Sequence, residues 1–154
     1  MQVYYAKRPR TVVRWAQGSL TSLPSNRQQH HAAQEQAEAN WRTAVHAAEL
    51  KKAYDLLVLD LRDITSFTDF FLICSVNNSR QGHAVCDEIR KQLKEIGELP
   101  VNVEGYERAE WILMDFFTFI VHVFTPQTRA FYSLERLWGD AERIDVSDEP
   151  PAAR

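Results

Sequence analysis

Four aspartates are the side chains of this sequence best suited to chemistry, because carboxylates on strands hold the divalent metals of enzymes that transfer nucleotides. They are Asp60, Asp63, Asp69 and Asp115. Such an enzyme needs carboxylates at alternate positions of one strand, so that they share a face. The position two after Asp69 is Phe71, and no Gly-Ser phosphate loop precedes it. We therefore predict no catalytic residue and no metal site, and interpret Asp60 and Asp69 as strand-end residues. An enzyme with an altered metal site is the alternative.

Histidine and cysteine add no further chemical signal. Cys74 and Cys86 lack paired-ligand or redox spacing, so we expect packed thiols in a reducing compartment. His122 lies between two valines, and no His or Cys stands at metal-ligand spacing from it. Two interpretations are open at this point: a hydrogen-bonded histidine of a sheet, or part of a contact surface near Trp111. No cofactor is predicted.

Charge is distributed unevenly along the 154 residues. Residues 1–42 hold six Lys and Arg against two Glu, whereas residues 43–154 hold twelve against nineteen, a net charge of −7. An acidic domain is repelled by phosphate backbones and attracted to basic protein surfaces. We therefore expect no direct nucleic-acid binding by the core. No apolar run approaches the roughly 20 residues that span a membrane.

Apolar periodicity predicts a mixed α/β domain, in the α+β sense of a five-stranded sheet flanked by helices. Expected helices cover residues 27–52, 80–96 and 127–138. Expected strands cover residues 55–61, 70–76, 101–104, 111–116 and 119–124, the last two as a hairpin. In the last helix, a core stripe is predicted from the spacing of Phe131, Leu134, Leu137 and Trp138.

Composition divides the chain into four segments. We expect a basic, disordered tail over residues 1–26, a helical extension over 27–45, the main domain over 46–142, and a disordered acidic tail over 143–154. The first segment is rich in Arg and free of acidic residues, which is typical of an organelle transit peptide. A misassigned start codon or a simple basic tail explains it equally well, and we prefer these. The expected location is therefore the cytoplasm, with an organelle as the alternative.

Several motifs agree in order and spacing with one known family. They are Leu57–Arg62, Ser66–Ser75, Ser79–Gln81, Glu104–Gly105, Glu110–Asp115, Val121–Phe124, Arg129–Tyr132 and Leu134–Asp140. Over residues 46–142 the chain resembles the ribosomal silencing factor family, also called the Iojap family. The resemblance implies a nucleotidyltransferase-like fold without catalytic residues, which binds large-subunit ribosomal protein uL14. It also implies a steric block to subunit joining that represses translation, a possible homodimer, and a role in large-subunit assembly for organelle relatives.

The same resemblance predicts the residues that contact the partner, which are Trp111, Asp115, Phe116, His122, Arg129 and Tyr132. Trp111 and Phe116 have opposite parity in one strand, so they point to opposite faces unless the strand end twists. Plain core is the alternative for Trp111. For Arg129 and Tyr132, which lie three apart, the alternative is a solvated helix face.

The sequence departs from the family pattern at two turns. Val76 and Phe117 stand where glycine is usual, and Thr118 stands where an acidic residue is usual. We therefore expect different backbone geometry at both turns. Phe117 is expected to fold back on the sheet, with an added partner contact as the alternative.

Overall fold

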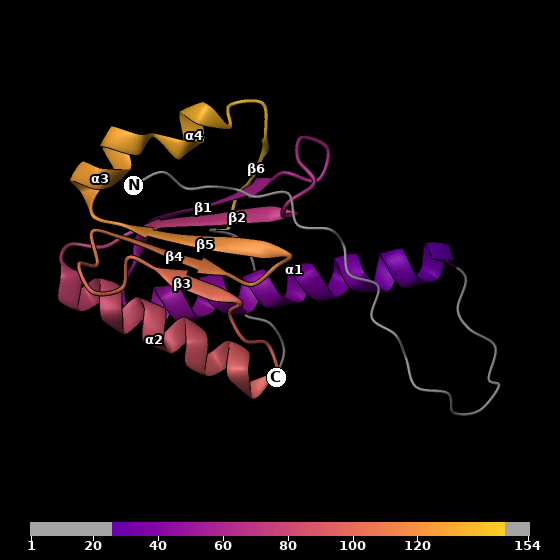
Figure 1. Cartoon of the computed structure of the whole chain (residues 1–154), viewed down its shortest axis with the longest axis horizontal. Coiled ribbons are helices and arrows are strands. Elements are labelled where there is room, and N and C mark those ends of the chain that lie inside the picture. Colours follow the sequence, from indigo (N-terminus) through magenta and orange to yellow (C-terminus); the bar gives the residue numbers. More distant parts are fainter. Residues whose placement is uncertain (1–25, 147–154) are drawn as a thin grey trace.

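The computed structural model describes residues 26–146, which form one six-stranded sheet with helices on both faces (Figure 1). The strands are β1 (Tyr54–Asp60), β2 (Phe70–Ser75), β3 (Asn102–Glu104), β4 (Trp111–Asp115), β5 (Phe119–Phe124) and β6 (Glu142–Ile144). The helices are α1 (Asn26–Leu50), α2 (Ser79–Glu95), α3 (Pro126–Tyr132) and α4 (Leu134–Leu137). The predicted fold class is confirmed, with six strands in place of five.

The sheet has the strand order β3-β4-β5-β2-β1-β6. β2 and β5 pair in parallel at its centre, and the other pairings between described strands are antiparallel. Every residue of β2 and β5 is buried, because α1 and α2 cover one face of the sheet and α3 and α4 cover the other (Figure 1). The sheet therefore separates two apolar clusters.

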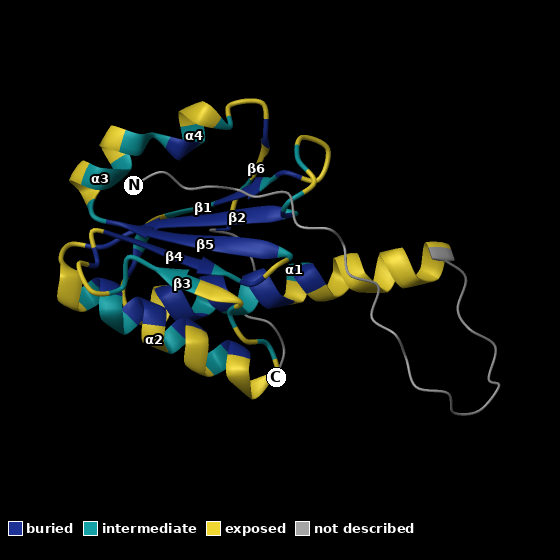
Figure 2. Ribbon diagram, viewed as in Figure 1, coloured by how far each residue is buried: buried dark blue, intermediate teal, exposed yellow. Residues whose placement is uncertain are grey.

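Helix α1 has two halves with different surroundings. Residues 27–36 are exposed on all sides, and this half extends beyond the sheet (Figure 2). From Ala37 onward, Trp41, Ala44 and Ala48 are buried at helical spacing. The small alanines let the helix approach the sheet closely. The predicted boundary at residue 45 thus falls inside one continuous helix that packs on the domain.

Gln81 joins the end of α1 to the start of α2. Its Nε2 donates hydrogen bonds to the carbonyl oxygens of Lys51 (3.0 Å) and Lys52 (2.8 Å), and its Oε1 accepts one from the Asn77 backbone N–H (2.8 Å). Asn78 Oδ1 caps α2 by accepting from the Gln81 backbone N–H (2.9 Å). These bonds satisfy carbonyl and amide groups that helix ends leave open.

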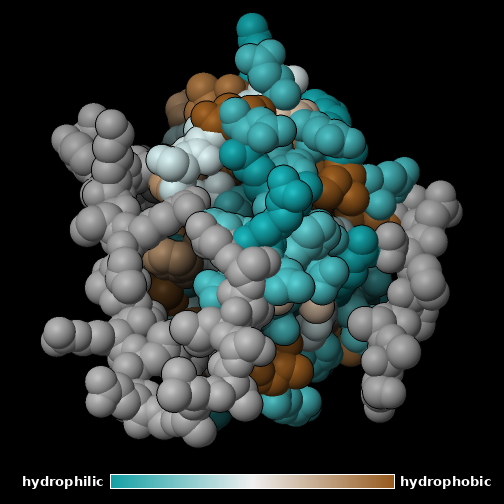
Figure 3. Space-filling model, turned by 90° about the vertical axis from the view of Figure 1, so that its right-hand side faces the viewer, coloured by the Kyte–Doolittle hydropathy of each residue, from teal (hydrophilic) through white to brown (hydrophobic). Residues whose placement is uncertain are grey.

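The turn between β4 and β5 keeps the backbone conformation that favours glycine, so the expectation of a different geometry there is wrong. Phe117 itself takes the left-handed conformation, with φ +73°. Its backbone N–H donates to Asp115 Oδ1 (2.8 Å), which holds the turn. The Phe117 side chain is 52% exposed, so the expectation that it folds back on the sheet is wrong. This turn lies at the end of the molecule that faces the viewer in Figure 3, where hydrophobic areas are separated by hydrophilic side chains.

Replacing Phe117 by glycine is expected to raise the free energy of unfolding by about 1 kcal/mol. The reason is that a bulky residue at positive φ is strained, whereas its exposed ring contributes little burial. Urea unfolding measures the change. The matched control is Thr118→Gly, at a position with negative φ, which should lose about 0.5–1 kcal/mol instead. Equal losses in both variants would contradict the strain argument.

The predicted last helix is interrupted. Ser133 has left-handed backbone angles (φ 43°, ψ 55°) and separates α3 from α4. The predicted core stripe required one continuous helix, and the break turns part of it outward. Leu134 is buried and Trp138 is half-buried, whereas Phe131 and Leu137 are exposed, so the stripe prediction is wrong for these two residues.

The C-terminal part of the described chain adds a strand at the edge of the sheet. β6 pairs with β1 through Val58↔Ile144 and Asp60↔Glu142. Residues 143 and 144, predicted as the start of an acidic tail, therefore belong to the sheet. Of the two predicted tails, residues 1–25 and 147–154 lie outside the described residues.

Candidate partner-binding site

Three of the six predicted contact residues meet on the sheet face beneath α3 and α4. The Trp111 ring of β4 lies 4.5 Å from the Tyr132 ring of α3 and 5.9 Å from the His122 ring of β5, measured between centroids. It also stacks on Phe124 at 5.0 Å. The cross-strand pairing of Trp111 with Phe124 places these side chains on one face. The result is a packed aromatic cluster beneath α3.

His122 is a neutral, internal member of this cluster. Trp111 Nε1 donates a hydrogen bond to His122 Nδ1 (3.1 Å), so the histidine proton lies on Nε2. Complete burial disfavours the charged form and lowers the pKa of His122 to about 3. Its Nε2 has no hydrogen-bond partner among the described residues, and its ring meets the Phe71 ring at 4.6 Å and 77°. His122 is therefore a hydrogen-bonded sheet histidine, and a direct partner contact by it stays a prediction.

Arg129 holds α3 and α4 against the sheet. Its Nη1 donates to the carbonyl oxygen of Asp55 (2.8 Å) and to Ser75 Oγ (2.7 Å), and its Nε donates to Glu135 Oε1 (2.6 Å). A guanidinium with its donors directed inward in this way fixes the position of the two short helices. Within the structure Arg129 is thus a positioning residue, and a direct partner contact by it stays a prediction.

Trp111 is only 7% exposed and His122 is fully buried, so the aromatic patch expected on the surface is covered. Tyr132, which is half-buried, forms part of that cover. Phe116 lies on the opposite face, stacked on Phe119 at 4.8 Å in the cluster beneath α1 and α2. Trp111 and Phe116 therefore point to opposite faces of the sheet, as alternation along β4 requires. The end of the strand does not twist enough to bring the two side chains onto one face.

Asp115 stands at the far end of β4. Its carboxylate is half-buried and accepts from the Phe117 backbone N–H, so it stabilises the turn. It does not reach the aromatic cluster around Trp111. A partner contact by Asp115 or Phe116 stays a prediction, without support from their positions.

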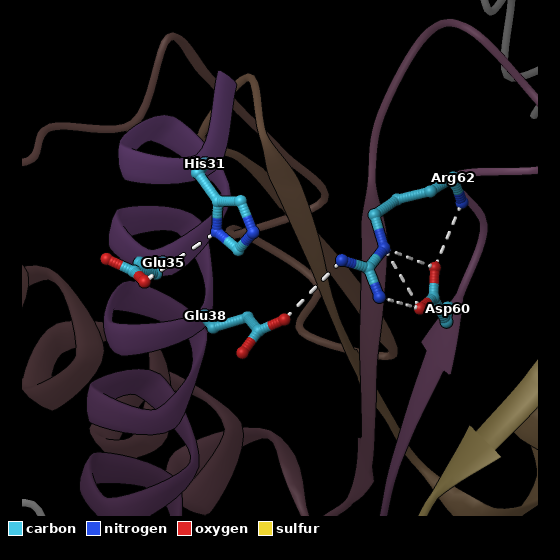
Figure 4. A network of polar contacts seen from close by, with 5 residues as sticks. All are labelled: His31, Glu35, Glu38, Asp60 and Arg62. Atoms are coloured by element: carbon cyan, nitrogen blue, oxygen red, sulfur yellow. Dashed lines mark hydrogen bonds and ion pairs between the residues drawn. The ribbon is translucent and has the colours of Figure 1, made fainter. Parts of the chain in front are cut away.

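Among the carboxylates considered for metal chemistry, Asp60 is engaged with a cation. Asp60 pairs with Arg62, which also reaches Glu38 of α1 at 3.5 Å (Figure 4). Burial acts to raise the pKa of Asp60, but hydrogen bonds from Arg62 outweigh it and hold that pKa below its ordinary value. Within residues 26–146 no three His, Cys, Asp or Glu side chains group so as to hold a metal ion. Asp60 thus fastens β1 to α1.

Sequence reasoning missed the residues that position α3 and α4. Ser75 and Glu135 meet Arg129, yet they lie 54 residues before it and six after it. Ser75 belongs to a distant strand and Glu135 lies beyond the break at Ser133, so no local sequence pattern identifies these contacts. The exposure of Phe131 was missed because it depends on how α3 lies over the sheet.

The fold and site place this chain among mixed α/β proteins whose sheet carries a closed aromatic cluster beneath two short helices. The chain belongs to the ribosomal silencing factor family, because the family model described as "Ribosomal silencing factor during starvation" matches residues 33–154. None of the helices between residues 26 and 146 is long and apolar enough to cross a membrane.

Individual relatives agree with this assignment. The ribosomal silencing factor RsfS of Halalkalibacterium halodurans is 42% identical over 103 residues, which cover 67% of this chain and 88% of the relative. A crystal structure of a Chromobacterium violaceum protein superimposes with a TM-score of 0.66 at 30% identity, covering 75% of this chain and 95% of that one. A mouse relative called "Mitochondrial assembly of ribosomal large subunit protein 1" is 31% identical over 91 residues, 57% of this chain and 40% of its own. The names of the Halalkalibacterium halodurans and mouse relatives describe ribosomal factors rather than enzymes.

Proposed function

We propose that this protein binds the large ribosomal subunit through ribosomal protein uL14 and prevents joining of the small subunit by occupying space, which represses translation. Membership in the ribosomal silencing factor family carries the proposal. The charge of the domain supports it, because the −7 of residues 43–154 favours approach to a basic protein surface. The proposed mechanism contains no catalytic step.

The direct test is subunit joining in vitro. Purified large and small subunits are mixed with and without the protein, and joined particles are separated on a sucrose gradient. The proposal expects the protein to sediment with large subunits and to reduce the joined fraction. Subunits that join freely in its presence, with no protein bound to large particles, would remove the proposed function.

Replacing Tyr132 by alanine is expected to weaken binding to large subunits about tenfold, because half-buried aromatic residues beside an interface act as anchors. Co-sedimentation over a range of protein concentrations measures the affinity. The matched control is Tyr106→Ala, which makes the same change at a half-buried tyrosine of the opposite cluster. Equal affinities for the two variants would contradict a binding site on the α3–α4 side.

Assembly of the large subunit is a second candidate function, favoured by the name of the mouse relative. The same contact would serve it, but the protein would associate with immature rather than mature large particles. Cell fractionation distinguishes the two functions. We place the action in the cytoplasm, with an organelle as the alternative if residues 1–26 are a transit peptide. A homodimer stays a prediction that sedimentation equilibrium tests.

A further inference from the structure

The two most exposed large apolar side chains among the described residues both lie in the α3–α4 segment. Phe131 is 81% exposed and Leu137 is 71% exposed, whereas the other exposed large apolar side chains lie between 41% and 60%. α3 has no buried residue at all, although it lies against one face of the sheet (Figures 1 and 2) and its Tyr132 ring meets Trp111 of the aromatic cluster at 4.5 Å. A helix with large apolar side chains directed to solvent is typical of an interaction surface.

Phe131 is also supported by a series of aromatic rings that contact one another. Its ring meets Tyr132 edge-on at 5.0 Å, Tyr132 lies 4.5 Å from Trp111, and Trp111 stacks on Phe124. Behind these rings, Arg129 fixes α3 to β1 and β2. An exposed ring on a fixed support loses little conformational freedom when it binds, and this favours affinity. Single exposed apolar residues elsewhere on the surface lack this arrangement.

We infer that Phe131, together with Leu137, anchors this protein on its partner by entering an apolar depression in a basic protein surface of the large subunit. The inference rests on the proposed function and names its contact surface. It accounts for the burial of Trp111 and His122, which support the contact from beneath. The partner chemistry follows from charge: a phenylalanine ring can stack on an RNA base, but the acidic domain disfavours a phosphate backbone and favours a basic protein.

The test compares two phenylalanines with the same substitution. Phe131→Ser and Phe117→Ser both change an exposed ring, so both variants should keep the circular dichroism spectrum and unfolding midpoint of the wild type within error. Phe131→Ser is expected to weaken co-sedimentation with large subunits about tenfold or more, as loss of an anchor does. Phe117→Ser, at the opposite end of the sheet, should change it less than about twofold, and Leu137→Ser should fall between them.

Purified uL14 and protein-free large-subunit RNA serve as separate probes of the partner. Wild type should bind uL14, and Phe131→Ser should bind it about tenfold more weakly. If wild type bound the RNA saturably, and if Phe131→Ser weakened this binding while Phe117→Ser did not, the inference of a protein partner would be wrong. If Phe131→Ser bound large subunits with wild-type affinity while Tyr132→Ala still bound them weakly, Phe131 would not be the anchor, but the proposed function would remain supported. Failure of the wild type to bind large subunits would overturn both.

Discussion

Gly105→Ala is expected to lower the free energy of unfolding by at least about 3 kcal/mol, enough to leave a domain of this size largely unfolded under mild denaturant. Gly105 has φ +72°, and an added Cβ would lie 2.0 Å from the carbonyl oxygen of Trp111. Real Cβ atoms do not approach backbone that closely. The backbone of Trp111 cannot easily move away, because it pairs with Phe124 at the start of β4.

A second glycine separates steric overlap from backbone conformation. Gly97 has φ +83°, but no atom lies within 4 Å of a Cβ added there. Gly97→Ala should therefore cost only about 1 kcal/mol, the penalty of the left-handed conformation. Urea unfolding of both variants measures the difference. Similar losses would show that the contact with Trp111 is relieved by small shifts, contrary to our expectation.

Acid should destabilise the protein through His122. In the folded state its pKa is about 3, against an ordinary value of 6.5. Between these pH values the unfolded chain binds a proton that the folded chain does not, so stability is complete above pH 6.5 and decreases as the pH falls toward 3. Lowering the pH from 7 to 5 should cost roughly 2 kcal/mol from this group alone.

The measurement is urea unfolding at pH 7 and pH 5 for wild type and His122→Gln. Glutamine does not titrate and keeps an acceptor within reach of Trp111 Nε1. The variant is less stable at pH 7 because its packing changes, so the comparison is the change with pH in each protein. Wild type should lose about 2 kcal/mol more than the variant between the two pH values. Equal losses would show that His122 is protonated without unfolding.

The sequence predicted the central elements well because their signals are local. β2 and β5 are continuous apolar runs, which interior strands require, and α2 has both an Asn cap and a terminal glycine. β6 was missed because Glu142–Ile144 is short and mostly polar, and it becomes a strand only through pairing with β1. The break at Ser133 was missed because serine carries no strong signal for left-handed angles.

The candidate site was predicted in part. Family motifs identified Trp111, His122 and Tyr132, and the structure brings these three together. They could not show that Arg129 points inward, since its acceptors come from distant segments. Nor could they show that Phe131 points outward, since exposure depends on how α3 lies over the sheet. Local sequence patterns thus identify the residues of the candidate site, but they do not show which of those side chains are exposed to solvent.

The parallel pairing of β2 with β5 has a consequence for the order in which the molecule can be built. Phe70 pairs with Phe119, so the two central strands are separated by about fifty residues of chain. Pairing over such a distance closes a large loop and is slow. During synthesis the middle of the sheet must wait until Phe124 has left the exit tunnel. Until then β2, which is fully buried in the complete sheet, has no neighbour on one side, and a shortened chain ending before β5 would be prone to aggregate through that open edge.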